Sequence, residues 1–259
     1  MTQQNTSTAL ANRTVLITGG NGGIGFGMAE ACGRAGADLI LWGRSSEKNR
    51  TAEHRLREAG LNAIAIECDV AEPESVTAAF DASLEASDGH IDSVFANAGT
   101  TGDGRRFVDL DLEDWRRVMA INLDGTFLTL QAAARHMTER GGGGSLVAVS
   151  STSAIHGAPG NEAYGASKTA LLGLVRALAV GLARHDVRVN ALLPGWTRTD
   201  LASVGYESDR FRDIIIGRTP VRRWAEPEEL GAPAVFLADP TTTFHTGDCL
   251  VVDGGYTVF

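Results

Sequence analysis

A tyrosine and a lysine stand four residues apart in the segment YGASK, as Tyr164 and Lys168. At α-helical pitch this spacing places both side chains on one face, with Cβ atoms about 6 Å apart, and the small residues between them leave room for a ligand. A nearby ammonium favours a phenolate and would lower the tyrosine pKa from about 10 by on the order of 1 to 3 units. The pair therefore indicates general acid and base chemistry, although the same spacing also occurs on helix surfaces without any function.

A glycine-rich loop follows the first apolar run of the chain. The run TVLIT ends at residue 18, and TGGNGGIG at 18–25 leads into a segment of helical character. Glycines so placed let the chain turn tightly and let a diphosphate approach the backbone, while the helix N-terminus offers unpaired amides. The loop predicts a dinucleotide site, with a plain tight turn as the alternative. Its candidate residues are Gly19, Asn21, Gly23, Ile24 and Gly25.

Seven short apolar runs recur along the chain, separated by about six longer segments of helical periodicity. The runs are continuous rather than alternating, which indicates strands buried on both faces, as in a parallel sheet. Such a βαβ series is typical of an α/β protein. We therefore expect a single doubly wound Rossmann-type domain, with a seven-stranded parallel sheet and helices on both faces. The runs lie at 14–18, 38–42, 62–69, 91–97, 145–150, 187–193 and 249–253.

The polarity of the N-terminus and one long irregular stretch suggest how the chain is organised. Residues 1–12 are polar, lack the apolar core of a signal peptide and are predicted to be a disordered leader. Residues 13–259 are then one dinucleotide-binding and catalytic domain. The stretch 195–220 shows no clear packing pattern, and we predict that it is a loop that covers the substrate.

Composition narrows the function classes. The 259 residues carry a net charge of −9, and the 23 basic residues are scattered, so neither a nucleic-acid nor a membrane surface is predicted. The longest apolar tract, 170–183, is interrupted by Arg176 and is shorter than the roughly 20 residues of a membrane span, which indicates a buried or interface helix. Three distant cysteines, Cys32, Cys68 and Cys249, fit a reducing cytoplasm and predict neither disulfides nor a metal site.

Taken together, these segments resemble the short-chain dehydrogenase/reductase family, in its single-domain branch of 3-oxoacyl-ACP reductase-like and gluconate 5-dehydrogenase-like members. The resemblance covers residues 13–256 in the family's order and spacing. It departs from the usual pattern at Ala96, where Asn is more common, and at Thr197, where Ile or Val is common. The matching segments are TGGNGGIG, DV at 69–70, ANAG at 96–99, INLDGTF at 121–127, VSS at 149–151, YGASK, LLPGWTRT at 192–199 and VDGGY at 252–256.

This resemblance implies an NAD(P)-dependent oxidoreductase that moves hydride between a nicotinamide and a carbonyl or secondary alcohol. The family places its catalytic serine thirteen positions before the tyrosine, which is Ser151 here. Alternation along a strand would turn the neighbouring Ser150 the other way. Tyr164 would give the proton, Ser151 would bond the alkoxide and Lys168 would bind the nicotinamide ribose. Asn122 would anchor a water in a proton relay.

Cofactor choice depends on the end of the second strand. Gly43 occupies the position where NAD-selecting members usually carry an acid, and Arg44 follows it, so NADP(H) is favoured. Gly22, where many NADP-dependent members have a second basic residue, leaves NAD(H) open. Asp69 and Asn97 could instead be turn formers. The further cofactor contacts that the resemblance implies are Asp69, Val70, Asn97, Ala98, Gly99, Pro194, Gly195, Thr197 and Thr199.

Several alternatives stay open. A Rossmann-type regulatory protein could bind the dinucleotide without turnover. The substrate carries no readable code and could be a 3-oxoacyl thioester, a sugar acid, a polyol or another secondary alcohol. His156 and Trp196 are candidates for the substrate pocket or for packing. Two strongly apolar helices, around residues 122–137 and 167–183, predict a homotetramer.

Overall fold

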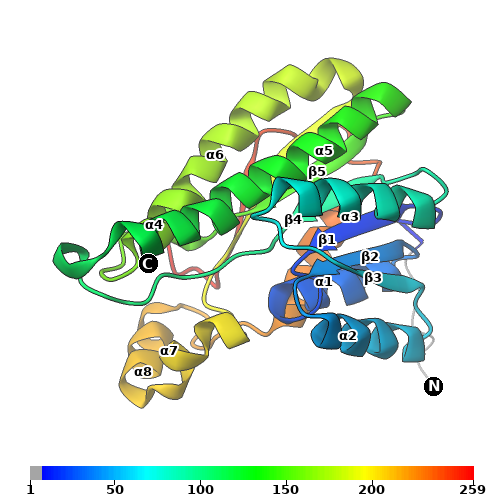
Figure 1. Ribbon diagram of the computed structural model, residues 1–259. Coiled ribbons are helices and arrows are strands. Elements are labelled where there is room, and N and C mark those ends of the chain that lie inside the picture. Colours follow the sequence, from blue (N-terminus) through cyan, green and yellow to red (C-terminus); the bar gives the residue numbers. More distant parts are fainter. Residues whose placement is uncertain (1–7) are drawn as a thin grey trace, which may run out of the picture.

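The computed structural model describes residues 8–259. Seven parallel strands form one sheet in the order β3-β2-β1-β4-β5-β6-β7, with helices on both faces (Figure 1). The predicted doubly wound α/β fold is confirmed, and each strand lies within a few residues of its predicted run. The strands are β1 Thr14–Thr18, β2 Asp38–Gly43, β3 Ala63–Glu67, β4 Ser93–Ala96, β5 Gly144–Val149, β6 Val187–Pro194 and β7 Cys249–Val252.

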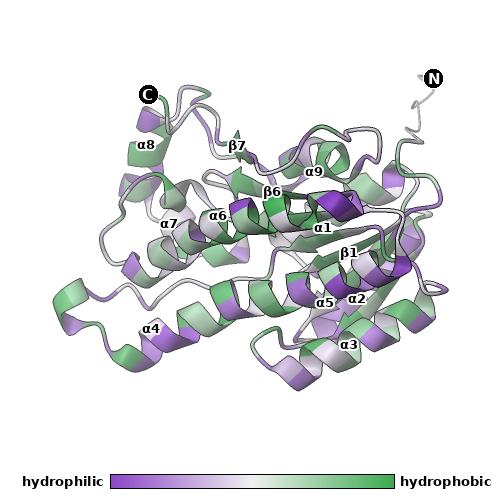
Figure 2. Ribbon diagram, turned by 90° about the horizontal axis from the view of Figure 1, so that it is seen from above, coloured by the Kyte–Doolittle hydropathy of each residue, from purple (hydrophilic) through white to green (hydrophobic). Residues whose placement is uncertain are grey.

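Two layers of helices enclose the sheet. Their apolar residues pack on a largely apolar set of strands, which is green in the hydropathy view (Figure 2). One face is covered by α3 Pro73–Ala86, α5 Gly125–Arg140 and α6 Glu162–Leu182. The other face is covered by α1 Gly23–Arg34, α2 Ser46–Glu58 and α9 Gly231–Ala238. Three more helices, α4 Leu112–Met119, α7 Ser203–Glu207 and α8 Asp209–Arg218, raise the number within 8–259 above the six expected.

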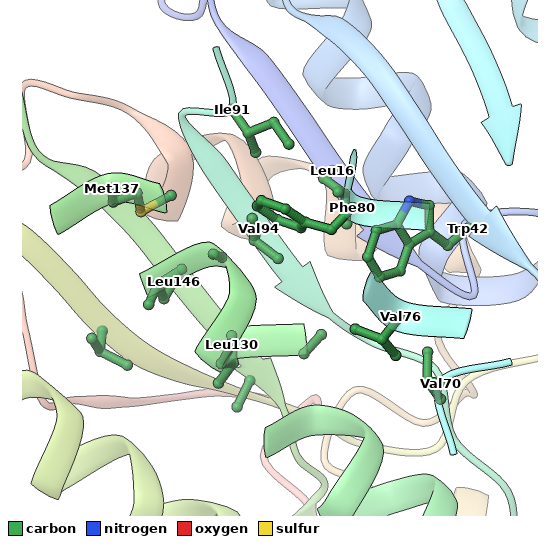
Figure 3. Packing of buried hydrophobic residues seen from close by; sticks show 14 of the residues in the cluster. Leu16, Trp42, Val70, Val76, Phe80, Ile91, Val94, Leu130, Met137 and Leu146 are labelled. Atoms are coloured by element: carbon green, nitrogen blue, oxygen red, sulfur yellow. The ribbon is translucent and has the colours of Figure 1, made fainter. Parts of the chain in front are cut away.

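The larger core cluster holds the sheet against α3, α5 and α6 (Figure 3). Trp42 of β2 is fully buried and meets Phe80 of α3 edge to face, with ring centroids 6.3 Å apart. Its indole Nε1 donates to Ser83 Oγ at 2.9 Å, so the one polar atom of the ring is satisfied. This packing fixes the helices relative to the strand ends that carry the site.

The strand order reverses next to β1, because the chain builds outward through β2 and β3 and then returns to place β4 on the other side of β1. Ligands of open α/β sheets bind outside the carboxyl ends of the strands at such a point. The segments predicted to be functional follow the carboxyl ends of β1, β4, β5 and β6. The topology therefore brings them to one edge.

Two predictions about chain organisation are corrected. Leu10 is fully buried, and its N–H donates to the Ala35 carbonyl at 3.0 Å, so residues 8–12 pack against the end of α1 and are not a disordered leader. Residues 1–7 of the predicted leader lie outside the described residues. The stretch 195–220 is not a loop either, since it contains the turn Asp200–Ala202 and the helices α7 and α8.

An aromatic cluster explains the order of that stretch. Trp196 packs against Phe211 and Trp224, with ring centroids 5.2 Å apart in each pair, and Tyr206 lies 5.3 Å from Trp224. Trp224 lies outside the predicted loop and is nearly fully buried. The two short helices thus depend on a contact from a later part of the chain.

Candidate active site

Tyr164 and Lys168 lie in the first two turns of α6, one turn apart. The Lys168 Nζ atom is 5.7 Å from the centroid of the Tyr164 ring, so the two side chains share a face as predicted. Lys168 is buried, and its Nζ donates to the carbonyl of Val149, the last residue of β5, at 2.8 Å. Burial lowers the pKa of Lys168 to about 8, because the ammonium has lost most of its water.

The pKa of Tyr164 departs from the prediction. Burial raises the pKa of this phenol, and the side-chain hydrogen bond with Ser151 opposes that rise. The expected lowering by Lys168 is absent, since removal of the phenolate from water is the larger effect and the lysine donates to Val149. Burial in the folded chain therefore disfavours the phenolate.

Two adjacent serines after β5 take opposite directions, as alternation predicts. Ser150 is buried, and its Oγ donates to the Lys168 carbonyl at 2.8 Å. Ser151 bonds Tyr164 through its side chain, and its Oγ also accepts from the Ser153 N–H at 3.1 Å. Ser151 is thus the serine that faces the tyrosine.

Asn122 is fully buried in a π-helical turn, Ala120–Asp124, between α4 and α5. Its Oδ1 accepts from the Thr100 N–H at 2.8 Å, and its Nδ2 donates to the Thr100 carbonyl at 2.9 Å and to Ser167 Oγ at 3.0 Å. Both amide hydrogens are therefore used within the protein. The side chain joins the segment after β4 to the helix that carries Tyr164.

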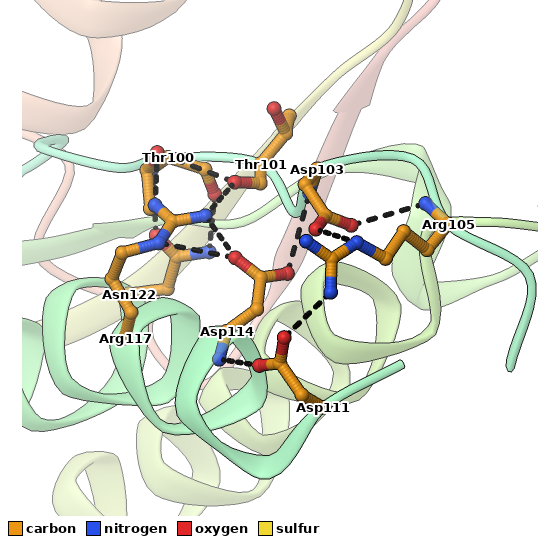
Figure 4. A network of polar contacts seen from close by, with 8 residues as sticks. All are labelled: Thr100, Thr101, Asp103, Arg105, Asp111, Asp114, Arg117 and Asn122. Carbon is orange, nitrogen blue, oxygen red and sulfur yellow. Dashed lines mark hydrogen bonds and ion pairs between the residues drawn. The ribbon is translucent and has the colours of Figure 1, made fainter. Parts of the chain in front are cut away.

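A polar network holds Thr100 from the other side (Figure 4). Arg117 of α4 donates to Thr100 Oγ1 at 3.2 Å and to the Thr101 carbonyl at 3.0 Å. It is paired with the buried carboxylate of Asp114, which also accepts from the Asp103 N–H at 3.3 Å. The segment that orients Asn122 is thereby tied to α4.

The glycine loop has the features that a diphosphate requires. Gly19 and Gly23 have φ angles of +62° and +50°, which other residues rarely adopt. Helix α1 begins after Gly22, with no side-chain cap and no acidic residue in its first turn, and a Cβ at Gly22 would meet nothing within 4 Å. Open backbone amides at a helix N-terminus fit a bound phosphate. Asn21 differs from the others, since its Nδ2 donates to Asn49 Oδ1 at 2.7 Å.

The last two glycine-loop candidates lie within α1. Gly25 packs so closely that an added Cβ would lie 2.2 Å from the Gly19 carbonyl oxygen. Ile24 is partly buried against the core beneath the loop. Both residues hold the loop against the sheet.

Residues after β4 connect the sheet to the catalytic group. The Asn97 and Ala98 N–H groups both donate to Thr18 Oγ1 at 2.9 Å, and Asn97 Nδ2 donates to the Thr18 carbonyl at 2.8 Å. An added Cβ at Gly99 would lie 3.3 Å from Asn122 Oδ1 and 3.4 Å from Lys168 Nζ. Asn97 therefore ties β4 to β1, and Gly99 lies beside the catalytic candidates.

The ends of β2 and β3 also meet. Arg44 is 64% exposed in its side chain, with Nη1 3.8 Å from Asp69 Oδ2, so the guanidinium is only loosely held. Asp69 Oδ1 accepts from the Ala71 N–H at 3.0 Å, which is a turn-forming role. Val70 is buried against the start of α5.

The segment after β6 extends toward the glycine loop. The Gly195 N–H donates to the Val252 carbonyl at 2.9 Å, which continues the pairing of Pro194 with β7. Thr197 is buried, with its Oγ1 donating to the Gly195 carbonyl at 3.1 Å. Thr199 faces the glycine loop, since a Cβ at Gly23 would lie 3.1 Å from its Cγ2. The segment thus approaches the loop from the opposite side.

The structure also shows where the pocket candidates lie. Trp196 packs within the aromatic cluster, and the His156 ring lies 5.2 Å from that of Tyr256. The structure adds residues that sequence patterns did not indicate: Thr18, Asn49, Thr100 and Arg117. Thr18 belongs to the glycine motif, but the others carry no local signal. Within residues 8–259 no cluster of three or more His, Cys, Asp or Glu side chains could hold a metal ion.

Comparison with known proteins gives matches over nearly the whole chain. A family model described as enoyl-(acyl carrier protein) reductase matches residues 19–257. The chain is 36% identical to an L-rhamnose 1-dehydrogenase (NAD(P)(+)) of Azotobacter vinelandii, over 95% of this chain and 97% of the relative. It is 35% identical to a 5-keto-D-gluconate 5-reductase of Escherichia coli, over 96% and 97% respectively. A solved gluconate 5-dehydrogenase from Burkholderia cenocepacia, in complex with NADP and tartrate, matches with a TM-score of 0.91 and 36% identity over 98% of both chains.

Proposed function

Because the chain belongs to the short-chain dehydrogenase/reductase family, it is an NAD(P)-dependent oxidoreductase, and we propose that Tyr164 is its general acid and base. The observation that carries this proposal is the convergence of Ser151, Tyr164 and Lys168 after the carboxyl end of β5. The segment 97–99 links them to the glycine loop, since Gly19 lies beside Asn97 and Gly99 beside Lys168. The relatives are dehydrogenases and reductases, so a regulatory protein without turnover is not supported.

The side chains divide the proton chemistry among them. A bound dinucleotide would supply the hydride for reduction of a carbonyl carbon and would accept it in oxidation of an alcohol. Tyr164 Oη holds the proton that the substrate oxygen takes up in reduction. Ser151 donates a hydrogen bond to the same oxygen as negative charge grows there. The Lys168 ammonium favours that charge from the same face of α6.

The candidate cofactor residues follow the carboxyl ends of the strands. We assign the phosphates to the glycine loop, because α1 begins there with uncapped amides. We assign the nicotinamide end to the region between Gly99 and Lys168 on one side and the segment after β6 on the other. Asn97, Asp69 and Val70 would border the adenosine of a bound dinucleotide. On the other side, a second set would approach it from the segment after β6: Pro194, Gly195, Thr197 and Thr199.

We propose a preference for NADP(H), with NAD(H) also used. The end of β2 has Gly43 in place of a carboxylate, and the loosely held Arg44 can pair with a 2′-phosphate. Its contact with Asp69 opposes this preference only weakly, because exposed ion pairs contribute about 0–1 kcal/mol.

The substrate is proposed to be a small polar alcohol or carbonyl. Relatives named for rhamnose and 5-ketogluconate make a polyhydroxylated compound the first class to test. Residues 195–220, with α7 and α8, are proposed to cover this substrate.

We further propose a cytoplasmic homotetramer. Cys32, Cys68 and Cys249 are all free thiols. The α6 region, Glu162–His185, is long and apolar enough to cross a membrane by length and composition, but only 28% of its most apolar window is buried within the chain. Its buried residues, including Lys168 and Leu171, face the sheet. The apolar outer face is therefore assigned to subunit contacts rather than to lipid.

Replacement of Tyr164 by Phe tests the function. NADPH oxidation with a panel of polyol-derived ketones and keto acids should fall by about 10³-fold or more, since the proton donor is lost. The dissociation constant for NADPH, measured by fluorescence, should change less than about threefold. Turnover that survives in the variant would remove Tyr164 as the acid, whereas wild-type binding without any turnover would favour the regulatory alternative.

A further inference from the structure

Asn49 is a buried asparagine that joins four segments around the end of β2. It lies in the first turns of α2 and is 4% exposed. Its Nδ2 donates to the Gly43 carbonyl at 2.9 Å and to the Ile66 carbonyl of β3 at 3.3 Å. Its Oδ1 accepts from Asn21 Nδ2 of the glycine loop at 2.7 Å. Both amide hydrogens and the oxygen are thus engaged, so the side chain has one orientation.

This arrangement fills the space above Gly43. A Cβ at that position would lie 2.1 Å from Asn21 Nδ2 and 2.5 Å from Asn49 Oδ1. Gly43 does not have a positive φ, so its backbone would accept another residue. A side chain at position 43 would therefore have to displace the ends of two asparagine side chains, and the three hydrogen bonds of Asn49 resist that displacement.

We propose that Asn49 is a positioning residue for dinucleotide specificity, which acts through Asn21. It holds Asn21 over the end of β2 and so denies position 43 to a carboxylate, the group that would bind a ribose 2′-hydroxyl and repel a 2′-phosphate. Discrimination then depends on Arg44, whose guanidinium has one ion-pair partner among residues 8–259, Asp69 at 3.8 Å. This inference rests on the proposed preference for NADP(H) and names the residues that maintain it.

The charges near the end of β2 are consistent with this role. Glu67, at the end of β3, accepts a hydrogen bond from Ser46 Oγ, and Asp69 lies 3.8 Å from Arg44. Neither carboxylate is among the nearest atoms to the place of a side chain at position 43. Asn21 presents an amide there, which does not repel a phosphate as a carboxylate would.

Binding of two adenosine probes to the full chain tests the proposal without turnover. Adenosine 2′,5′-bisphosphate and adenosine 5′-monophosphate differ only in the 2′-phosphate, and calorimetry gives the ratio of their dissociation constants. Gly43→Asp alone should weaken both probes about tenfold or more, with little change in the ratio, because the new side chain displaces the loop. Gly43→Asp together with Asn21→Ala and Asn49→Ala should shift the ratio at least tenfold toward the monophosphate.

A shift of equal size in Gly43→Asp alone would overturn the proposal, because the asparagines would then exclude nothing. The absence of a shift in the triple variant would also overturn it. Asn62→Ala is the matched control, since Asn62 joins β2 and β3 at their opposite ends, through Asp38 at 2.9 Å, and should leave the ratio unchanged.

A second pair of variants covers the case in which the triple variant does not fold. Gly43→Ala should weaken both probes, and adding Asn21→Ala should restore most of the binding, because Asn21 is the nearest group to the new methyl. Unchanged binding of both probes in Gly43→Ala would show that Asn21 and Asn49 do not obstruct a side chain at position 43. A wild-type protein that binds both probes equally would refute the NADP(H) preference, while the coupling between 43, 21 and 49 would still be measured separately.

Discussion

Burial controls the protonation of the residue at the centre of the site. Lys168 is 3% exposed and donates to one neutral carbonyl, that of Val149, so its charged form is disfavoured and its pKa falls to about 8. Below pH 8 the lysine is charged in both folded and unfolded chains, and the folded state bears the desolvation penalty. Above pH 10.5 it is neutral in both, and the penalty disappears.

Lys168→Met measures that penalty. Between pH 8 and 10.5 the unfolded wild-type chain binds more protons than the folded chain, so wild-type stability should rise relative to the variant by up to about 3 kcal/mol. Urea unfolding of both proteins at pH 7 and pH 10.5 gives the two differences. A difference independent of pH would mean that the lysine keeps an ordinary pKa in the folded state.

The serine pair after β5 allows the proposed catalytic role of Ser151 to be tested separately from stability. Ser151→Ala should lower kcat by about 10²-fold, because it removes a donor to the developing alkoxide, and should leave the melting temperature almost unchanged. Ser150→Ala should instead lower the unfolding free energy by about 1 kcal/mol, through the lost bond to the Lys168 carbonyl, with a smaller loss of kcat. Steady-state kinetics and thermal unfolding measure the two effects. A larger loss of kcat in Ser150→Ala and a larger loss of stability in Ser151→Ala would contradict this assignment.

At the scale of elements, α4 orients the irregular segment that follows β4. Residues 100–106 follow β4 without regular structure, and Arg117 and Asp114 of α4 bond Thr100, Thr101 and Asp103 (Figure 4). Thr100 in turn accepts from and donates to the amide of Asn122. The position of Asn122 therefore depends on the contacts that α4 makes with residues 100–103.

Arg117→Ala tests this dependence. Amide hydrogen exchange at Thr100 and Asp103 should become faster, and kcat should fall several-fold, because the segment beside Asn122 loses its anchor. The unfolding free energy should change by about 1 kcal/mol or less, since Arg117 is partly exposed. Arg116→Ala, an exposed neighbour on the same helix, is the control. Equal exchange rates in the two variants would show that Arg117 does not hold the segment.

At the scale of the whole molecule, apolar surface on α5 and α6 remains outside the core. Phe127 and Val180 are 44% and 83% exposed, on two helices that cover the same face of the sheet. Exposed apolar side chains on neighbouring helices can form contacts between subunits. The proposed homotetramer would cover them.

Light scattering should give a mass of about four times the 27.3-kDa chain. Val180→Glu should reduce that mass, because a carboxylate would be buried at the contact between subunits. Val204→Glu places the same change on the exposed helix α7 and should leave the mass unaltered. A wild-type monomer would refute the assembly, and an equal effect of both variants would refute the assignment of α6.

Local patterns were sufficient for much of the fold and for the position of the catalytic candidates. Continuous apolar runs bounded by glycine and polar residues predicted the strands, because a strand buried on both faces has no polar face. Helical pitch alone placed Tyr164 and Lys168 together. Strand alternation separated Ser151 from Ser150. Each of these properties depends on neighbours in the chain, and so it is visible in the sequence.

Other features were decided only by contacts between distant segments. Asn49 meets Asn21 across 28 positions of sequence, and the helices α7 and α8 depend on Trp224. The pKa of Tyr164 was predicted with the wrong sign, because the spacing to Lys168 reports a nearby charge but not how much water the folded chain removes from the phenol. Desolvation and long-range packing arise only when the chain closes on itself, and no local pattern of residue types records them.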